Sequence, residues 1–148
     1  MLYYIYCNEM WNQLDGLTGL LSQKSYLNRT LNLQPEDKML IVLDLDNFKY
    51  INDTYGHQAG DQCLKVIAEC LKKAYSRYGN CYRIGGDEFC VLFRKPEKEK
   101  YCREKFYWII EKQKKSLHML PGASYGSALI EEQESISEEC FTDHEPEA

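Results

Sequence analysis

The spacing of apolar residues divides the chain into helical and extended segments. Residues 39–43 form a continuous apolar run, which is typical of a buried strand. Residues 58–76 repeat apolar side chains every three or four positions, so they predict a long amphipathic helix. Two further strands are expected at residues 81–84 and 89–93, joined by a hairpin turn, and a last strand at residues 123–130.

Shorter helices are predicted between these segments. Ser22 is a suitable N-cap for a helix that runs to about Leu33. Residues 48–55 predict a short helix, and residues 97–117 predict a longer one. The apolar face of the longer helix is expected to comprise Tyr101, Phe106, Ile109 and Ile110. Helices and strands thus follow one another in an order that favours an α+β fold.

The first residues have a pattern of their own. Tyr4, Cys7, Trp11 and Leu14 are spaced by three, four and three positions, as in a heptad seam, so residues 2–14 predict a helix. Two heptads are too few to distinguish a coiled-coil linker from a helix that packs on its own domain. A turn at residues 15–20, with two glycines, follows it.

The composition narrows the class of protein. A chain of 148 residues with 44% hydrophobic residues is long enough for one folded domain. No apolar stretch is long enough to cross a membrane, and the first residues lack the features of a signal peptide. The seven cysteines are odd in number and form no CxxC pair, so we expect reduced thiols and a cytoplasmic location.

The charge is unevenly distributed. The net charge is −5, but residues 131–148 carry eight acidic residues and no Lys or Arg, which leaves 15 acidic against 18 basic residues in the rest. A mildly basic body suits a small anionic ligand, whereas nucleic-acid binding needs a denser basic surface. We therefore expect neither nucleic acid nor a membrane as a partner.

Four acidic residues lie where strands end. Asp44 and Asp46 follow the buried strand, and Asp87 and Glu88 lie at the tip of the hairpin. If the two strands pair, these carboxylates meet at one edge of the sheet, where they need a cation, and Mg²⁺ (or Mn²⁺) is the natural one. The start of the next helix, at residues 47–49, offers free N–H groups to phosphates. Two metal ions held there would serve phosphoryl transfer.

Simpler readings exist for each feature by itself. The spacing of Asp44 and Asp46 also begins an EF-hand loop, but Phe48, Lys49 and Tyr55 occupy positions that need an oxygen ligand, glycine and glutamate. An isolated acidic pair in a turn is ordinarily solvated, and two glycines suit any hairpin. Only the combination favours a functional site.

Three motifs resemble those of GGDEF domains, the family of diguanylate cyclases. Residues 44–61 read DLDNFKYINDTYGHQAGD, similar to the family signature DxDxFKxINDxxGHxxGD. Residues 83–89 read RIGGDEF and match the RxGGDEF hairpin at every defined position. Residues 15–20 read DGLTGL and match the DxLTGL turn. The resemblance covers residues 15 to about 130 and implies a fold related to nucleotide cyclases and polymerase palms, with a mixed, mainly antiparallel sheet flanked by helices.

The resemblance also implies a reaction and its catalytic residues. Two GTP molecules, one on each chain of an antiparallel homodimer, would condense into cyclic di-GMP and two pyrophosphates. By matching position, Asp44 and Asp87 would bind the metal ions together with the Leu45 carbonyl, and Glu88 would assist metal binding or proton transfer.

Other matched positions would bind the substrate. Phe48 and Lys49 would hold the phosphates, and Asn52 and Asp61 would recognise the edge of guanine. Gly85 and Gly86 belong to the same hairpin. The resemblance further pairs Asp15 with Arg83, which would fix the DxLTGL turn.

The chain departs from the family pattern at three places. Residues 76–79 read SRYG where many members carry the RxxD motif that binds the product, and residues 22–24 replace the usual Asn-Arg. No basic closing helix follows Ile130. We therefore divide the chain into an N-terminal linker helix (1–14) and a GGDEF domain shortened at its C-terminal helix (15–148), with no sensor domain.

These departures leave two functional hypotheses open. The first is an active diguanylate cyclase. The second is a weak or inactive GGDEF module that binds GTP or a partner protein. The intact hairpin and metal-binding acids favour the first, and the missing closing helix favours the second.

Overall fold

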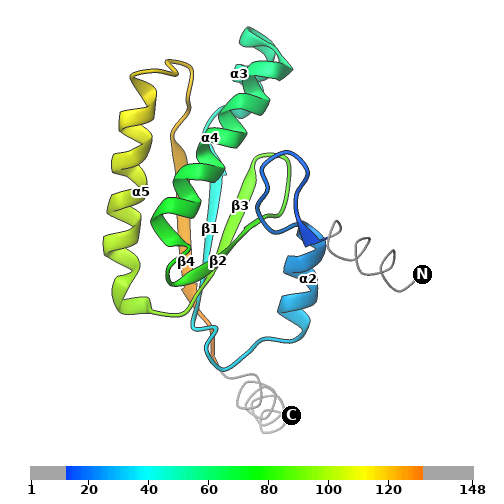
Figure 1. Cartoon of the computed structure of the whole chain (residues 1–148), viewed down its shortest axis with the longest axis vertical. Coiled ribbons are helices and arrows are strands. Elements are labelled where there is room, and N and C mark those ends of the chain that lie inside the picture. Colours follow the sequence, from blue (N-terminus) through cyan, green and yellow to red (C-terminus); the bar gives the residue numbers. More distant parts are fainter. Residues whose placement is uncertain (1–12, 132–148) are drawn as a thin grey trace, which may run out of the picture.

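The computed structural model describes residues 13–131 (Figure 1). The helices are α2 (Gln23–Leu31), α3 (Phe48–Tyr55), α4 (His57–Tyr75) and α5 (Glu99–Lys114), with a 3-10 turn at Pro96–Lys98 before the last one. The strands are β1 (Met39–Leu45), β2 (Gly79–Arg83), β3 (Glu88–Phe93) and β4 (Ala123–Leu129). The order of elements agrees with the sequence pattern.

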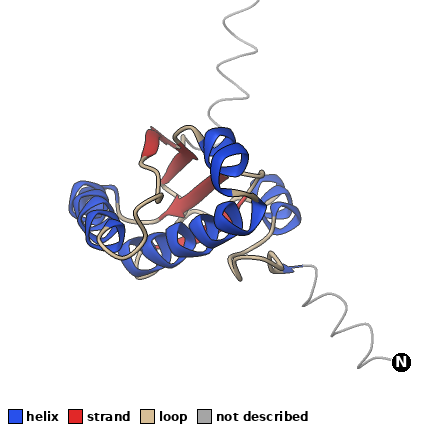
Figure 2. Cartoon of the chain, turned by 90° about the horizontal axis from the view of Figure 1, so that it is seen from above, coloured by secondary structure: helices blue, strands red, loops and turns tan. Residues whose placement is uncertain are grey.

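The four strands form one sheet in the order β2-β3-β1-β4. Every pair of neighbouring strands is antiparallel. Among residues 13–131, the one parallel pairing is an isolated bridge between Leu21 and Tyr82 of β2, so the sheet is mainly antiparallel as expected. Viewed from above, the strands run between helices that flank them on more than one side (Figure 2). The fold is therefore α+β, as predicted.

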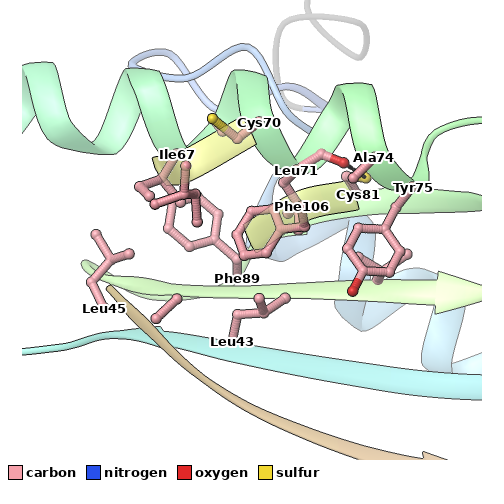
Figure 3. Close-up of a cluster of buried hydrophobic side chains, with 14 of the residues drawn as sticks. Leu43, Leu45, Ile67, Cys70, Leu71, Ala74, Tyr75, Cys81, Phe89 and Phe106 are labelled. Atoms are coloured by element: carbon pink, nitrogen blue, oxygen red, sulfur yellow. Dashed lines mark hydrogen bonds between the residues drawn. The ribbon is translucent and has the colours of Figure 1, made fainter. Parts of the chain in front are cut away.

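The main core lies between the sheet and the pair α4 and α5. The apolar stripe of α4 is buried as its periodicity predicts, and Ile67, Leu71 and Tyr75 are among its fully buried members. They pack against side chains of one sheet face, including Leu43 and Phe89 (Figure 3). Burial of these large apolar groups is the main stabilising contribution to such a core.

A smaller cluster covers part of the opposite face. Tyr82, Cys90 and Leu92 are buried there, and Tyr26 of α2 meets Tyr82 edge to face with ring centroids 5.6 Å apart. Helix α2 begins at the N-cap that the sequence predicts, because the Ser22 hydroxyl accepts a hydrogen bond from the Ser25 N–H.

Beside α2, Arg29 binds Asp37 through two hydrogen bonds of 3.0 and 3.1 Å. Only 2% of the Asp37 side chain is exposed, so the fold needs this ion pair to satisfy a buried carboxylate.

Two details of the sequence prediction were wrong. Tyr101 is 63% exposed, and Cys102 takes the inward position on α5, because Cys102 lies four positions before the buried Phe106 and so on the same face of the helix. The second strand begins two residues early, at Gly79, where a side chain would lie 2.7 Å from the Leu92 carbonyl oxygen. Glycine permits that close approach.

The cysteines follow the prediction where the structure describes them. Five are free and buried, namely Cys63, Cys70, Cys81, Cys90 and Cys102. Burial raises the pKa of each of these thiols. No helix in the described part is long and apolar enough to cross a membrane. The heptad seam predicted for residues 2–14 falls almost entirely outside the described residues.

Candidate active site

The predicted carboxylates meet at one end of the sheet. Asp44 lies opposite Glu88 in the register of β1 and β3. The Leu45 N–H donates to the Asp87 carbonyl oxygen at 3.2 Å, which continues the ladder to the hairpin tip. Asp44, Asp87 and Glu88 are thus brought together by strand pairing, although more than 40 positions separate Asp44 from the others.

Their proximity changes the acidity of Asp44. Slight desolvation of the otherwise exposed Asp44, followed by the Asp87 carboxyl group, raises the pKa of Asp44, and the charges of Glu88 and Asp46 act in the same direction. Carboxylates held this close together repel one another, so they bind either a proton or a cation. The end of the sheet is therefore electrostatically prepared for a positive ion.

The chain turns sharply between β1 and α3. Asn47 adopts the left-handed conformation with φ 54°, which asparagine tolerates better than most residues. The Asn47 side chain makes no capping hydrogen bond, so the first N–H groups of α3, at Phe48 and Lys49, remain available beside the carboxylates. Such a helix start can bind a phosphate group.

Helices α3 and α4 approach each other closely at Gly60. A β-carbon at Gly60 would lie 1.9 Å from the Asn52 side-chain oxygen, so any larger residue there would displace the Asn52 side chain. Asn52 therefore lies directly against the residue that precedes Asp61. The two polar side chains predicted to recognise a base come from neighbouring parts of two helices, and Asp61 is exposed to solvent.

Arg83 connects the hairpin to the DxLTGL turn. The guanidinium group donates hydrogen bonds to the carbonyl oxygens of Gly85 and Gly86, at distances of 2.8 to 3.2 Å. It also forms an ion pair of 3.2 Å with Asp15, as the resemblance implied. Burial opposes ionisation of Asp15, but hydrogen bonds from Thr18 and the charge of Arg83 outweigh it and lower the pKa of Asp15.

An open cavity of about 500 Å³ lies on this side of the hairpin. Residues 14–16 and 22–24 form one wall, and residues 83–86 form the other. The cavity includes Gly85 and Gly86 but none of the carboxylates Asp44, Asp87 and Glu88. It is therefore adjacent to the predicted site and does not contain its acidic groups.

The donor set is too small to hold a metal ion with side chains alone. Among residues 13–131, no three His, Cys, Asp or Glu side chains are grouped as metal ligands. Asp44 and Asp87, with the Leu45 carbonyl, could supply part of a shell of oxygen ligands. That composition suits Mg²⁺, which ordinarily takes one or two carboxylates and completes its shell with water and substrate phosphates.

One contact was missed by sequence reasoning. The Ser124 hydroxyl donates a hydrogen bond of 2.5 Å to the Asp46 carboxylate, and the Asp46 N–H donates to the Gly122 carbonyl oxygen at 3.0 Å. Ser124 lies opposite Asp44 in the pairing of β1 and β4. Only that register reveals it, because nothing in the local sequence marks Ser124. Asp46 is thereby turned toward β4 by its own hydrogen bonds.

A comparison with protein families identifies one match. The family described as "Diguanylate cyclase, GGDEF domain" matches residues 12–143. These limits include every residue of the site.

Individual relatives agree with this match. Diguanylate cyclase DgcZ of Escherichia coli K12 is 36% identical over 105 residues, which are 68% of this chain and 36% of that protein. Diguanylate cyclase DgcS of Shewanella oneidensis is 39% identical over 90 residues, 57% of this chain and 30% of that protein. The chain therefore corresponds to about a third of the length of these relatives.

A solved structure supports the fold. The GGDEF domain of DgcB from Caulobacter crescentus, determined in complex with c-di-GMP, superimposes with a TM-score of 0.68 at 26% sequence identity. The superposition covers 88% of this chain and 86% of that domain.

Proposed function

The chain belongs to the GGDEF domain family, and from this membership and the site we propose that it is a diguanylate cyclase. In this proposal, two chains condense two GTP molecules into cyclic di-GMP and release two pyrophosphates. The observation that carries the proposal is the meeting of Asp44, Asp87 and Glu88 at the end of the sheet, beside the uncapped start of α3. GTP is a cytoplasmic metabolite, so the proposed location is the cytoplasm.

The proposed reaction consists of two equivalent steps. In each, the 3′-oxygen of one GTP forms a bond to the α-phosphorus of the other, and the bond from that phosphorus to the bridging oxygen of the β-phosphate breaks. Pyrophosphate leaves with that oxygen, and the hydroxyl proton passes to Glu88 or to water. Because one site holds one GTP, turnover requires two chains with their sites facing each other.

The carboxylates supply part of a cation site in this scheme. Asp44, Asp87 and the Leu45 carbonyl would hold Mg²⁺, and the raised pKa of Asp44 supports the choice because it reflects crowded negative charge. When bound, Mg²⁺ would neutralise phosphate charge and stabilise the charge that develops during transfer. The N–H groups of Phe48 and Lys49 would hold phosphate oxygens at the start of α3.

Asn52 of α3 and Asp61 of α4 would select guanine. The Asp61 carboxylate can accept hydrogen bonds from guanine N1–H and the 2-amino group, and adenine offers neither donor in that arrangement. Asn52 would complete the recognition of the same edge. A polar group that a bound base shields from water and leaves without a partner costs about 1–3 kcal/mol, so we expect ATP to bind about 30-fold more weakly than GTP.

Product formation tests the proposal directly. The chain is incubated with GTP and Mg²⁺, and cyclic di-GMP is measured by liquid chromatography and mass spectrometry. Asp87→Asn, which keeps the shape of the side chain, should lower the rate at least about 100-fold, because it removes a charge that binds the cation. The control Glu104→Gln removes one exposed charge from α5 and should retain the parent rate.

The result also separates the two functional hypotheses. Production of cyclic di-GMP that Asp87→Asn abolishes supports the enzyme. Binding of GTP without product, even at high protein concentration, identifies a non-catalytic GGDEF module instead. Equal binding of ATP and GTP in a titration would contradict the role given to Asn52 and Asp61.

A further inference from the structure

Asp46 is held by two hydrogen bonds, although the proposed reaction gives this residue no role. Its N–H donates to the Gly122 carbonyl oxygen at 3.0 Å, and its carboxylate accepts a hydrogen bond of 2.5 Å from the Ser124 hydroxyl. Ser124 belongs to the start of β4, and Gly122 to the loop just before that strand. Asp46 is therefore attached to β4 through both its main chain and its side chain.

The Ser124 hydroxyl donates to Asp46 and not to the residue directly opposite. In the pairing of β1 and β4, Ser124 lies opposite Asp44. Opposed residues on antiparallel strands share one face of the sheet, and a diagonal neighbour two positions away is still within reach of a side chain. Because a serine has one hydroxyl proton, its bond to Asp46 leaves the Asp44 carboxylate available to a cation.

The segment that holds Asp46 is itself attached to the core. The Tyr107 hydroxyl of α5 donates a hydrogen bond of 2.8 Å to the carbonyl oxygen of Ala123, which lies between the two partners of Asp46. The fit around the carboxylate is also close, because a β-carbon at Gly122 would lie 3.1 Å from its second oxygen. The start of β4 can therefore act as a fixed support for Asp46.

The residue that follows Asp46 leads directly into α3. Only Asn47 separates Asp46 from Phe48, the first residue of that helix. Asn47 has the left-handed conformation, and its side chain makes no capping hydrogen bond, so α3 lacks a cap that would hold its first turn. The hydrogen bonds of Asp46 are thus the contacts nearest to the N–H groups of Phe48 and Lys49 that tie this turn to the sheet.

We propose that Ser124 is a positioning residue for the triphosphate of GTP, because through Asp46 it holds the start of α3 beside Asp44, where the phosphates bind. The inference rests on the proposed function for the identity of the ligand. It makes Asp46 a support for the phosphate-binding turn and not a ligand of the cation. Ser124 and Asp46 are exposed, so water replaces their hydrogen bond when it is lost, and we expect an effect on phosphate binding and not on stability.

Nucleotide binding tests this role without turnover. 3′-Deoxy-GTP lacks the attacking hydroxyl, so the chain can bind it with Mg²⁺ and form no product, and guanosine carries no phosphate. In NMR titrations, Ser124→Ala should weaken the binding of 3′-deoxy-GTP about fivefold and leave that of guanosine within about twofold of the parent, because only the phosphates lose their support. Ser124→Thr keeps the hydroxyl and should recover most of the affinity.

A matched control lies on the same strand. Ser127→Ala makes the same change, but Ser127 pairs with Ile41 and lies away from Asp46, so this variant should bind both ligands like the parent. Thermal unfolding should place Ser124→Ala and Ser127→Ala within about 3 °C of the parent. A structural role for Ser124 would instead lower the melting temperature and leave the affinity for 3′-deoxy-GTP unchanged.

Product formation gives a second measurement. At saturating GTP, Ser124→Ala should form cyclic di-GMP about tenfold more slowly, because misplaced phosphates are poorly aligned with the attacking oxygen. Ser127→Ala should keep the parent rate. Asp46→Asn can still accept the bond from Ser124, so it should lose no more than about tenfold, against about 100-fold for Asp87→Asn.

Three results would overturn the proposal. The first is a Ser124→Ala variant that binds 3′-deoxy-GTP like the parent, and the second is an equal loss of affinity for 3′-deoxy-GTP and guanosine. The third is a loss of activity in Asp46→Asn as large as in Asp87→Asn while Ser124→Ala keeps the parent rate, because Asp46 would then be a cation ligand. A parent that binds 3′-deoxy-GTP but makes no product refutes the proposed enzyme alone, since the affinities still decide the role of Ser124. A parent that binds neither ligand refutes both.

Discussion

Replacement of Arg83 should uncouple the hairpin from the rest of the domain. The guanidinium group donates hydrogen bonds to the carbonyl oxygens of Gly85 and Gly86 and to the Asp15 carboxylate. It therefore fixes the turn on which Asp87 lies. Arg83→Met keeps much of the aliphatic packing but removes all of these hydrogen bonds. We expect a loss of stability together with a loss of turnover by the molecules that remain folded.

The structure gives the size of the effect. The side chains of Arg83 and Asp15 are 17% and 21% exposed, so their ion pair is partly shielded from water and contributes about 1 kcal/mol. The hydrogen bonds to the two carbonyl oxygens come from a charged donor and together contribute about 2 kcal/mol. Arg83→Met should therefore lower the free energy of unfolding by about 3 kcal/mol, and Arg83→Lys, which keeps the charge, by about half as much.

Urea unfolding followed by circular dichroism measures the stability, and cyclic di-GMP formation measures turnover. Arg29→Met is the control, because it breaks the ion pair with buried Asp37 and should cost about 3 kcal/mol or more. It lies away from the hairpin, so its folded molecules should turn over at the parent rate. The reasoning is refuted if Arg83→Met changes stability by less than about 0.5 kcal/mol, or if both variants lose turnover equally.

Three further predictions concern single groups. Among the residues that the structure describes, the buried Tyr75 hydroxyl has no hydrogen-bond partner, so Tyr75→Phe should raise the free energy of unfolding by about 1 kcal/mol. Tyr107→Phe, which loses the bond to the Ala123 carbonyl oxygen, should lower it by about 1 kcal/mol in the same urea experiment. Asp87→Asn should lower the pKa of Asp44 in an NMR titration without Mg²⁺, because it removes a neighbouring negative charge. The folded-state pKa of Asp15 lies below its unfolded value, so its stabilisation is complete above about pH 4 and is lost as the pH falls through the folded pKa. Asp15→Asn should therefore reduce the steepness of acid unfolding, and an unchanged acid transition would contradict this role.

The sequence pattern predicted the parts of the fold that depend on local periodicity. The stripe of α4 is spaced so regularly that its buried face could be assigned residue by residue, and β1 is apolar throughout its first five residues. The prediction failed for Tyr101, because it was assigned to the buried face for its apolar ring and not for its position in the helical period. Cys102 faces the core because it lies four positions before Phe106, whereas Tyr101 lies five positions before it and points to another side of the helix.

Some residues of the site can be found from sequence motifs, and others only from the way the strands pair. Asp44 and Glu88 could be placed together from sequence, because a hairpin and a central strand have few ways to pair. The contact of Ser124 with Asp46 joins residues 78 positions apart and depends on the register of β1 and β4, which a one-residue slip would reverse. The direction of the β4 backbone groups follows from the same register. A local pattern such as ASYGSAL identifies a strand, but the tertiary pairing decides which of its N–H groups bond to β1 and which point away from it.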